Sequence, residues 1–271
     1  FYAKTDTPGV TSGTATYRGT FEYLGDRYGF NVEHLAIGQH FDPQVGYARR
    51  TDFRRNFAEA RFTPRPKRRN RVRKYTFLGS MDYVTDAKVT VLQNKELRGL
   101  FQAEFQNSDN YTLEYLGDYE WLAKPFTISP GVVVPAGGYH YRNLRTSYSL
   151  GQQRMVSGRV SVGHGSLYNG SKTDASYSGR IALRPQIAVE PSISLNWVDL
   201  PYGSFSARLL NARFILTPSP RMIFSSLVQY NLSGHSITSS ARLRWEYRPG
   251  SELFLVRSEE HTSELQSHLN L

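Results

Sequence analysis

The sequence predicts an all-β fold, an antiparallel up-and-down β-barrel that crosses a membrane. Three observations favour it: side chains alternate between apolar and polar along the chain, the alternating segments are long, and tight turns alternate with longer loops. No segment shows an apolar stripe with the 3.6-residue period of a helix, so we expect very little helix. Counting the segments gives about fourteen strands in what we interpret as an incomplete fragment.

The alternation is clearest in residues 236–247. The apolar set is Ile237, Ser239, Ala241, Leu243, Trp245 and Tyr247, and the polar set is Ser236, Thr238, Ser240, Arg242, Arg244 and Glu246. Residues 110–121, 174–184 and 187–197 repeat the pattern. Arginine at the midplane of a bilayer costs about 2–4 kcal/mol in barrels. We therefore expect Ile237, Ala241, Leu243 and Trp245 to face lipid, and Arg242, Arg244 and Glu246 to face the lumen.

The connections follow the same order along the chain. Tight turns are expected near 25–27, 106–109, 151–153, 184–186, 217–220 and 248–250, longer loops at 39–52, 85–95, 123–138, 165–172 and 199–204, and a shorter loop near 232–236. Strands of about 11–14 residues exceed the five or six usual in soluble sheets and suffice for a tilted membrane crossing. As a meander, residues 187–198 should pair with both 172–184 and 204–217.

Aromatic residues near the strand ends match the interfacial girdles of membrane barrels. They are Tyr23, Tyr119, Trp121, Trp197, Trp245 and Tyr247. A soluble sandwich would show the same alternation, since it buries one face and wets the other. Two stacked sheets would however leave edge strands that need protection, whereas consecutive hairpins close more naturally into a ring.

Composition limits the alternatives. The 271 residues carry a formal net charge of +10 and no cysteine, which removes thiolate metal sites and cysteine nucleophiles. Much of the positive charge lies in the block 65–74, which holds no aromatic residue and accompanies no nucleic-acid-binding motif. We interpret this block as a solvated turn at a membrane surface and expect no nucleic-acid partner. A soluble basic all-β protein that binds nucleic acid stays as an alternative.

The last residues read differently from the rest. Residues 257–267 have the sequence R-S-E-E-H-T-S-E-L-Q-S, which is the in-frame translation of a common sequencing adapter. Such a scar is excluded from reasoning about the fold. We therefore expect a β-barrel domain over residues 1–256, truncated at both ends, and a non-native tail over 257–271 that belongs to no sheet.

Three segments carry a family resemblance. Residues 34–55 read H-L-A-I-G-Q-H-F-D-P-Q-V-G-Y-A-R-R-T-D-F-R-R, residues 196–201 N-W-V-D-L-P, and residues 243–253 L-R-W-E-Y-R-P-G-S-E-L. Together they resemble the C-terminal barrel of domain-of-unknown-function family 5916, whose first motif has the form F-N-P-E-V-G-F-x-R-R-x-D-x-R. Asp42 and Gln44 stand where that family commonly has Asn and Glu. The resemblance implies an outer-membrane protein of a Gram-negative bacterium, with a family-9-like carbohydrate-binding module ahead of the barrel.

No catalytic motif is present, so we expect no catalytic residue, cofactor or metal, and no enzymatic activity of this fragment. His34 and His40 are too isolated to form a metal site. Glu114, Asp118 and Glu120 share one face of a strand; they are either a glycosidase-like carboxylate set or, as we favour, lumenal charges paired with arginines of neighbouring strands.

The loop 39–55 is the better candidate site, because it mixes opposed charges with aromatic rings. Its candidate residues are Phe41, Asp42, Tyr47, Arg49, Arg50, Asp52, Arg54 and Arg55. They either anchor the loop through an ion-pair network, which we favour, or present a surface to a ligand. Second candidates are Tyr139, Tyr141, Tyr168 and Tyr202.

These features predict an outer-membrane protein that binds or transports glycans together with a carbohydrate-binding module outside this chain. Its expected partners are outer-membrane lipid and an oligo- or polysaccharide. The alternative is a carbohydrate-active hydrolase whose chemistry lies outside the chain or in the lumenal carboxylates.

Overall fold

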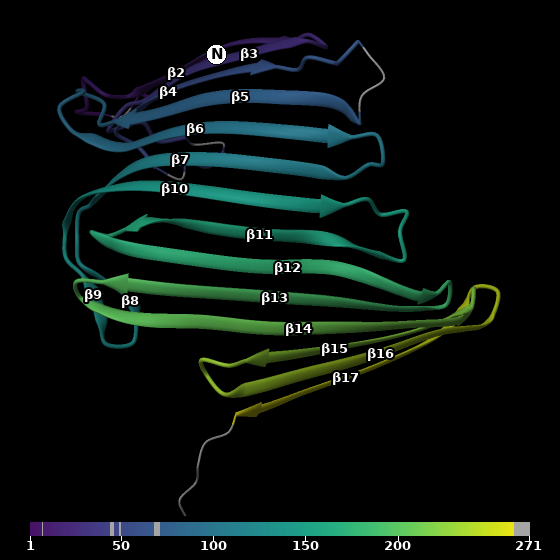
Figure 1. Ribbon diagram of the computed structural model, residues 1–271. Helices are drawn as coiled ribbons and strands as arrows, with labels where there is room; N and C mark the ends of the chain where they lie inside the picture. Colours follow the sequence, from purple (N-terminus) through teal and green to yellow (C-terminus); the bar gives the residue numbers. More distant parts are fainter. Residues whose placement is uncertain (7, 44–45, 49, 68–70, 263–271) are drawn as a thin grey trace, which may run out of the picture.

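The computed structural model describes residues 1–271 except 7, 44–45, 49, 68–70 and 263–271. Its regular elements are all strands, and the described part holds no helix that could cross a membrane. Fifteen strands form one sheet, and two more form a separate hairpin (Figure 1). The prediction of an all-β antiparallel fold with almost no helix is therefore confirmed.

The strands of the large sheet follow one another in space in the order of the chain, except that the hairpin lies between β7 and β10. They are β1 (Tyr2–Lys4), β2 (Ala15–Leu24), β3 (Tyr28–Ile37), β4 (Phe53–Phe62), β5 (Val72–Thr85), β6 (Leu92–Phe105), β7 (Asn110–Leu122), β10 (Gly137–Leu150), β11 (Val156–Leu167), β12 (Gly170–Arg184), β13 (Ile187–Leu200), β14 (Gly203–Ser219), β15 (Met222–Asn231), β16 (Ser236–Arg248) and β17 (Ser251–Thr262). The hairpin consists of β8 (Phe126–Ser129) and β9 (Val132–Val134).

Each neighbouring pair in the sheet is antiparallel. In particular β13 pairs with β12 on one side and with β14 on the other, which confirms the meander. Within the described residues no ladder joins β1 to β17, so the sheet is open at these two edges.

The connections divide the sheet into two ends. The turn end holds residues 25–27, 106–109 and 185–186, and the loop end holds residues 38–52, 86–91 and 123–136. Figure 1 shows the β6–β7 and β10–β11 connections of the turn end on the right and the hairpin of the loop end on the left.

Two of the predicted long loops are wrong. Residues 165–172 and 199–204 are mostly strand, and only two residues separate β11 from β12 and β13 from β14. Tyr168 and Asn169 have φ angles of 44° and 65°. Two consecutive residues with positive φ are what a type I′ hairpin turn needs, and this turn lets both strands run further than the glycines and tyrosines of the segment suggest.

The hairpin β8–β9 was also missed, because residues 123–138 read as one loop. Its turn is Pro130-Gly131, with Gly131 at φ 78°. Proline followed by glycine suits the central positions of a type II turn. The β-branched residues on both sides of this turn are the feature of the sequence that could have indicated the hairpin.

The expectation that residues 257–262 belong to no sheet is contradicted. These residues continue β17 and pair with β16, from Arg257 opposite Ala241 to Thr262 opposite Ser236. The ladder uses main-chain groups, which every residue except proline supplies, so it extends without regard to the side chains. The adapter origin of the tail stays a prediction, and residues 263–271 lie outside the described part.

A buried carboxylate ties two turns together at the turn end. Asp109 is only 2% exposed. It accepts hydrogen bonds from the Gly151 amide (2.8 Å), the Tyr148 hydroxyl (2.8 Å) and the Arg154 guanidinium (2.9 Å). Burial acts to raise the pKa of Asp109, but these hydrogen bonds and the charge of Arg154 together hold that pKa below its ordinary value.

We expect Asp109→Ala to lower the free energy of unfolding by about 1–3 kcal/mol, because it leaves the buried Gly151 amide without an acceptor and removes the partner of Tyr148 and Arg154. Since the folded-state pKa is depressed, this contribution is present above the unfolded-state pKa of about 3.9 and is lost as the pH falls through the folded-state value. Urea titrations from pH 7 downward should therefore show the gap between wild type and variant closing in acid.

The matched control is Asp26→Ala, which removes a carboxylate from another turn. The side chains of Asp26 and its ion-pair partner Arg65 are 71% and 59% exposed. Asp26→Ala should therefore lower the free energy of unfolding by only about 0–1 kcal/mol. Equal losses for the two variants would contradict the role given to Asp109.

Candidate functional site

The strand registers divide the side chains of the sheet between two faces. Directly paired residues share a face and alternate residues along a strand change face. The ladder from Asp82 to Glu96 to Asp118 to Tyr141 defines the polar face. The ladder from Met81 to Leu97 to Gly117 lies on the opposite, apolar face.

Large apolar side chains are exposed across the apolar face from β2 to β17. Among them, each between 37% and 65% exposed, are Phe21, Phe30, Val32, Phe77, Leu97, Tyr115, Leu144, Val160, Val162, Ile193, Phe214, Val228, Ile237 and Leu255. No described segment covers them. Within β2–β16, and leaving aside strand termini and β-bulges, five charged side chains lie on this face. They are Arg54, Lys95, Arg142, Asp199 and Arg208, and all five lie in the half of the strands nearer the loop end.

Aromatic residues of the apolar face gather in two rows near the strand ends. The turn-end row includes Tyr23, Tyr28, Phe62, Tyr75, Phe105, Tyr148, Trp245 and Tyr247. The loop-end row includes Tyr17, Tyr83, Tyr119, Trp121, Trp197 and Tyr230. All six aromatic residues predicted for the girdles lie on this one face.

Ion pairs between strands lie on the polar face. The tightest network joins Arg55 to both oxygens of Asp82, at 2.6–3.0 Å, and to Glu33 at 3.2 Å. Arg18 pairs with the same Glu33. Arg55 is thus held by two carboxylates, which fixes its guanidinium.

The three carboxylates of β7 have different surroundings. Glu114 pairs with Arg98 at 2.5 Å, as predicted. Glu120 instead accepts hydrogen bonds from the hydroxyls of Tyr141 (3.1 Å) and Tyr168 (3.4 Å). Asp118 Oδ1 is buried without a hydrogen-bond partner among the described residues. Among the described residues no arginine pairs with Asp118 or Glu120, and Glu96 and tyrosines occupy the neighbouring positions.

The hairpin β8–β9 packs on the polar face at the loop end. Val134 is fully buried and Val132 is 5% exposed, in a cluster with Tyr139, Tyr141, Tyr168, Val198 and Leu200. This cluster joins β10 to β13 across the intervening strands. Three of the four tyrosines proposed as second candidates therefore meet here, and Tyr202 packs against the same cluster.

The candidate loop residues are dispersed. Arg54 lies on the apolar face, Arg55 in the polar-face network, and Arg50 over the ring of Phe53 at 5.5 Å. Arg50 also lines a cavity of about 470 Å³ with Glu96, Asp118 and Glu120.

Other members of the loop make fewer contacts. The Asp42 amide donates to Thr5 Oγ1 at 3.3 Å, Tyr47 is 87% exposed, and Asp52 has a φ of 60°. Phe41 is half-buried, and Arg49 lies outside the described residues. The observed ion-pair network thus belongs to strands β2–β5, and a ligand-binding role of the loop stays a prediction.

The histidines and the basic block are engaged locally. His34 Nδ1 lies 2.7 Å from Asn56 Oδ1, and His40 Nδ1 lies 3.0 Å from the Ser12 carbonyl oxygen. In the basic block, Arg65 pairs with Asp26, while Arg73 and Lys74 pair with Glu104. No metal-ligating group of three His, Asp or Glu residues occurs in the part of the chain that the structure describes.

Strand β16 places its side chains on the predicted opposite faces. Arg242, Arg244 and Glu246 lie on the polar face, and Leu243 and Trp245 on the apolar face. The next strand does not keep this division, because Phe254 and Val256 lie on the polar face, opposite Arg244 and Arg242, and Arg257 and Glu259 lie on the apolar face. Comparisons of the chain with family models, curated proteins and solved structures find no match.

We expect Val134→Asp to release the hairpin from the polar face, because it places a carboxylate among apolar side chains. Proteinase K should then cleave within residues 123–136 at least about tenfold faster, since local opening limits such cleavage. Mass spectrometry of the fragments measures the rate. Val133→Asp is the matched control, because Val133 is 49% exposed, and it should cleave at the wild-type rate. Equal rates of proteinase K cleavage for the two variants would rule out the packing of Val134 on the polar face.

Proposed function

We propose that this chain forms the wall of a transmembrane β-barrel of the bacterial outer membrane, whose polar face lines a lumen that binds or conducts glycans. The observation that carries the proposal is the uncovered apolar face. Monomeric soluble proteins rarely expose a continuous apolar patch larger than a few hundred Å², whereas here large apolar side chains are exposed on strands from β2 to β17.

The distribution of charge on the apolar face supports lipid as its solvent. Within β2–β16 its five interior charges all lie toward one end, which leaves the middle and turn-end rows of these strands without charged side chains. The aromatic rows at both ends match the interfacial girdles of membrane barrels. Most strands have ten to seventeen residues, enough for a tilted crossing.

The polar face supports the second part of the proposal. A bilayer requires every strand to be hydrogen-bonded on both sides. The proposal therefore requires further pairing at the outer edges of β1 and β17, and along the part of β2 that the short β1 does not pair. The inner surface then carries the ion pairs, hydroxyl groups and carboxamides of the polar face. Glycans are the ligand class we propose, because the motif of residues 41–55 resembles barrels that follow a carbohydrate-binding module, and because clustered tyrosines and polar groups suit sugars.

Substitution of neighbouring residues tests the membrane assignment. Ile193 lies on the apolar face in the middle of β13, and Ser194 lies beside it on the polar face. We expect Ile193→Arg to reduce the free energy of folding into phosphatidylcholine vesicles by about 2–4 kcal/mol, while Ser194→Arg has a much smaller effect. Urea titration of the vesicle-inserted protein gives both values.

A soluble all-β protein gives the opposite result. In that case Ile193→Arg adds a charge to a wet surface and changes stability by no more than about 0.5 kcal/mol. A wild-type chain that folds as a monomer in buffer and does not enter vesicles would also refute the proposal.

A further inference from the structure

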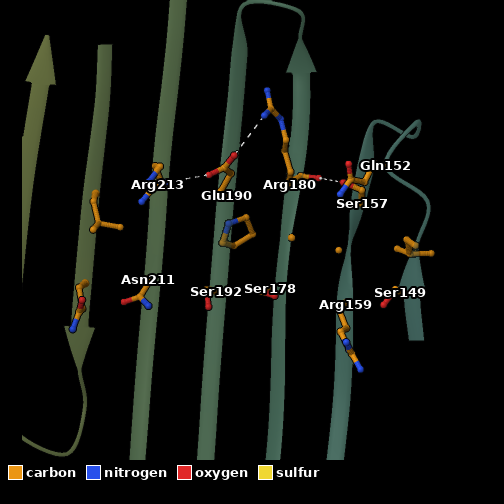
Figure 2. A pocket seen from close by; sticks show the side chains of 16 residues that line it. Ser149, Gln152, Ser157, Arg159, Ser178, Arg180, Glu190, Ser192, Asn211 and Arg213 are labelled. Carbon is orange, nitrogen blue, oxygen red and sulfur yellow. Dashed lines mark hydrogen bonds and ion pairs between the residues drawn. The ribbon is translucent and has the colours of Figure 1, made fainter. Parts of the chain in front are cut away.

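A groove of about 620 Å³ crosses the polar face near the turn end, between β10 and β15. Its lining residues lie at the opposite end of the strands from the residues that pack against the hairpin β8–β9. Figure 2 shows arginine, glutamate, serine and asparagine side chains along it, contributed by successive strands. None of the residues discussed above as candidate sites lines it.

The charged groups of this groove are paired at longer distances than those of the Arg55 network. Glu190 lies between Arg180 at 3.5 Å and Arg213 at 3.7 Å (Figure 2). Both distances exceed the 2.7–2.9 Å usual for charge-assisted hydrogen bonds. Both arginine side chains are 53% exposed, and both line the groove.

The ratio of charges differs from that around Arg55. There Arg55 is held by two carboxylates, and Arg18 brings the network to two arginines and two carboxylates. In the groove two arginines share the single carboxylate of Glu190, so arginine is in excess in the groove and not in the Arg55 network. Arg159 adds a third guanidinium to the lining and donates to Ser147 at 2.7 Å. With one carboxylate among them, the three arginines leave the groove with a net positive charge.

Neutral polar groups line the floor between these charges. Ser178, Ser192, Asn211 and Gln229 are directly paired across four strands, so they form one row on the polar face. The serines are short, which leaves room above them. Asn211 Oδ1 is buried without a hydrogen-bond partner among the described residues. Buried polar atoms are normally hydrogen-bonded, so this acceptor suits a donor from a ligand.

We propose that this groove binds a carboxylate-bearing saccharide such as an oligouronide. Arg180 and Arg213 would hold the carboxylate, since the planar guanidinium matches carboxylate oxygens in pairs. The row of hydroxyl and carboxamide groups would bind the sugar hydroxyls, with a ligand hydroxyl donating to Asn211 Oδ1. The inference deepens the proposed function and rests on it for the position of the groove inside a lumen.

The test is isothermal titration calorimetry of the full chain, folded in a zwitterionic detergent, with trigalacturonate and with its fully methyl-esterified form. The two ligands share their ring hydroxyls and differ in charge. Trigalacturonate should bind at least about tenfold more tightly, because only it can form charge-assisted hydrogen bonds with the guanidinium groups. Equal affinity of the two ligands, or no binding of trigalacturonate, would overturn the inference.

Variants locate the binding. We expect Arg213→Gln to weaken trigalacturonate binding by about tenfold. Arg213→Lys keeps the charge but loses the paired geometry, so a loss of about threefold is expected, and it replaces the first variant if that one fails to fold. Arg18→Gln is the matched control, because Arg18 also shares a carboxylate on the polar face and is 47% exposed. Its affinity should stay at the wild-type value, and a loss equal to that of Arg213→Gln would refute the site.

The outcome can be separated from that of the proposed function. Insertion of the same preparation into vesicles without preferential binding of trigalacturonate would refute the groove alone. Preferential binding in detergent without insertion into any vesicle would refute the membrane assignment alone.

Discussion

The register of the strand ladders is the constraint on which the rest of the structure depends. Each ladder from β1 to β17 sets residues opposite one another, so the face of one side chain determines the face of its partners on every other strand. A slip of one residue in a single ladder would move all later side chains to the other face. If the slip fell between β12 and β13, Arg213 and Glu190 would move to the apolar face, and Phe214 and Val189 to the polar face.

This division explains where the remaining features of the molecule can form. Ion pairs between strands occur on the polar face, where Arg55, Glu33 and Asp82 can meet across neighbouring strands. The hairpin β8–β9 supplies apolar side chains to that same face, and it buries Val134 against tyrosines and aliphatic residues of the loop end. The apolar face receives no such cover from the described residues. In our proposal lipid takes that place, and the polar groups enclose a lumen.

Much of the sheet could be predicted from the sequence because a strand with two different faces has a period of two. Residues 236–247 show this period without interruption, and both faces of β16 are as predicted. The turn at Tyr168 and Asn169 could not be read in the same way, because it depends on backbone angles rather than on composition. The hairpin was missed because its strands have only three or four residues. The pairing of residues 257–262 was missed because main-chain bonds extend a ladder whatever the side chains are.

The candidate site was predicted less well, because contacts between distant strands leave no local pattern. The charges of loop 39–55 predict an ion-pair network that anchors the loop, whereas the network observed joins strands β2–β5, and among the described residues of that segment only Arg55 takes part in it. The central claim is that the apolar face meets lipid. The three tryptophans test it most directly, because Trp121, Trp197 and Trp245 all lie on that face near strand ends. Their fluorescence should be measured in vesicles whose lipids carry bromine at shallow or deep acyl positions. If the apolar face meets lipid, the bromines should strongly quench the tryptophan emission, and shallow bromines should quench it more than deep ones. Tryptophan emission that neither lipid changes would contradict a lipid-facing position.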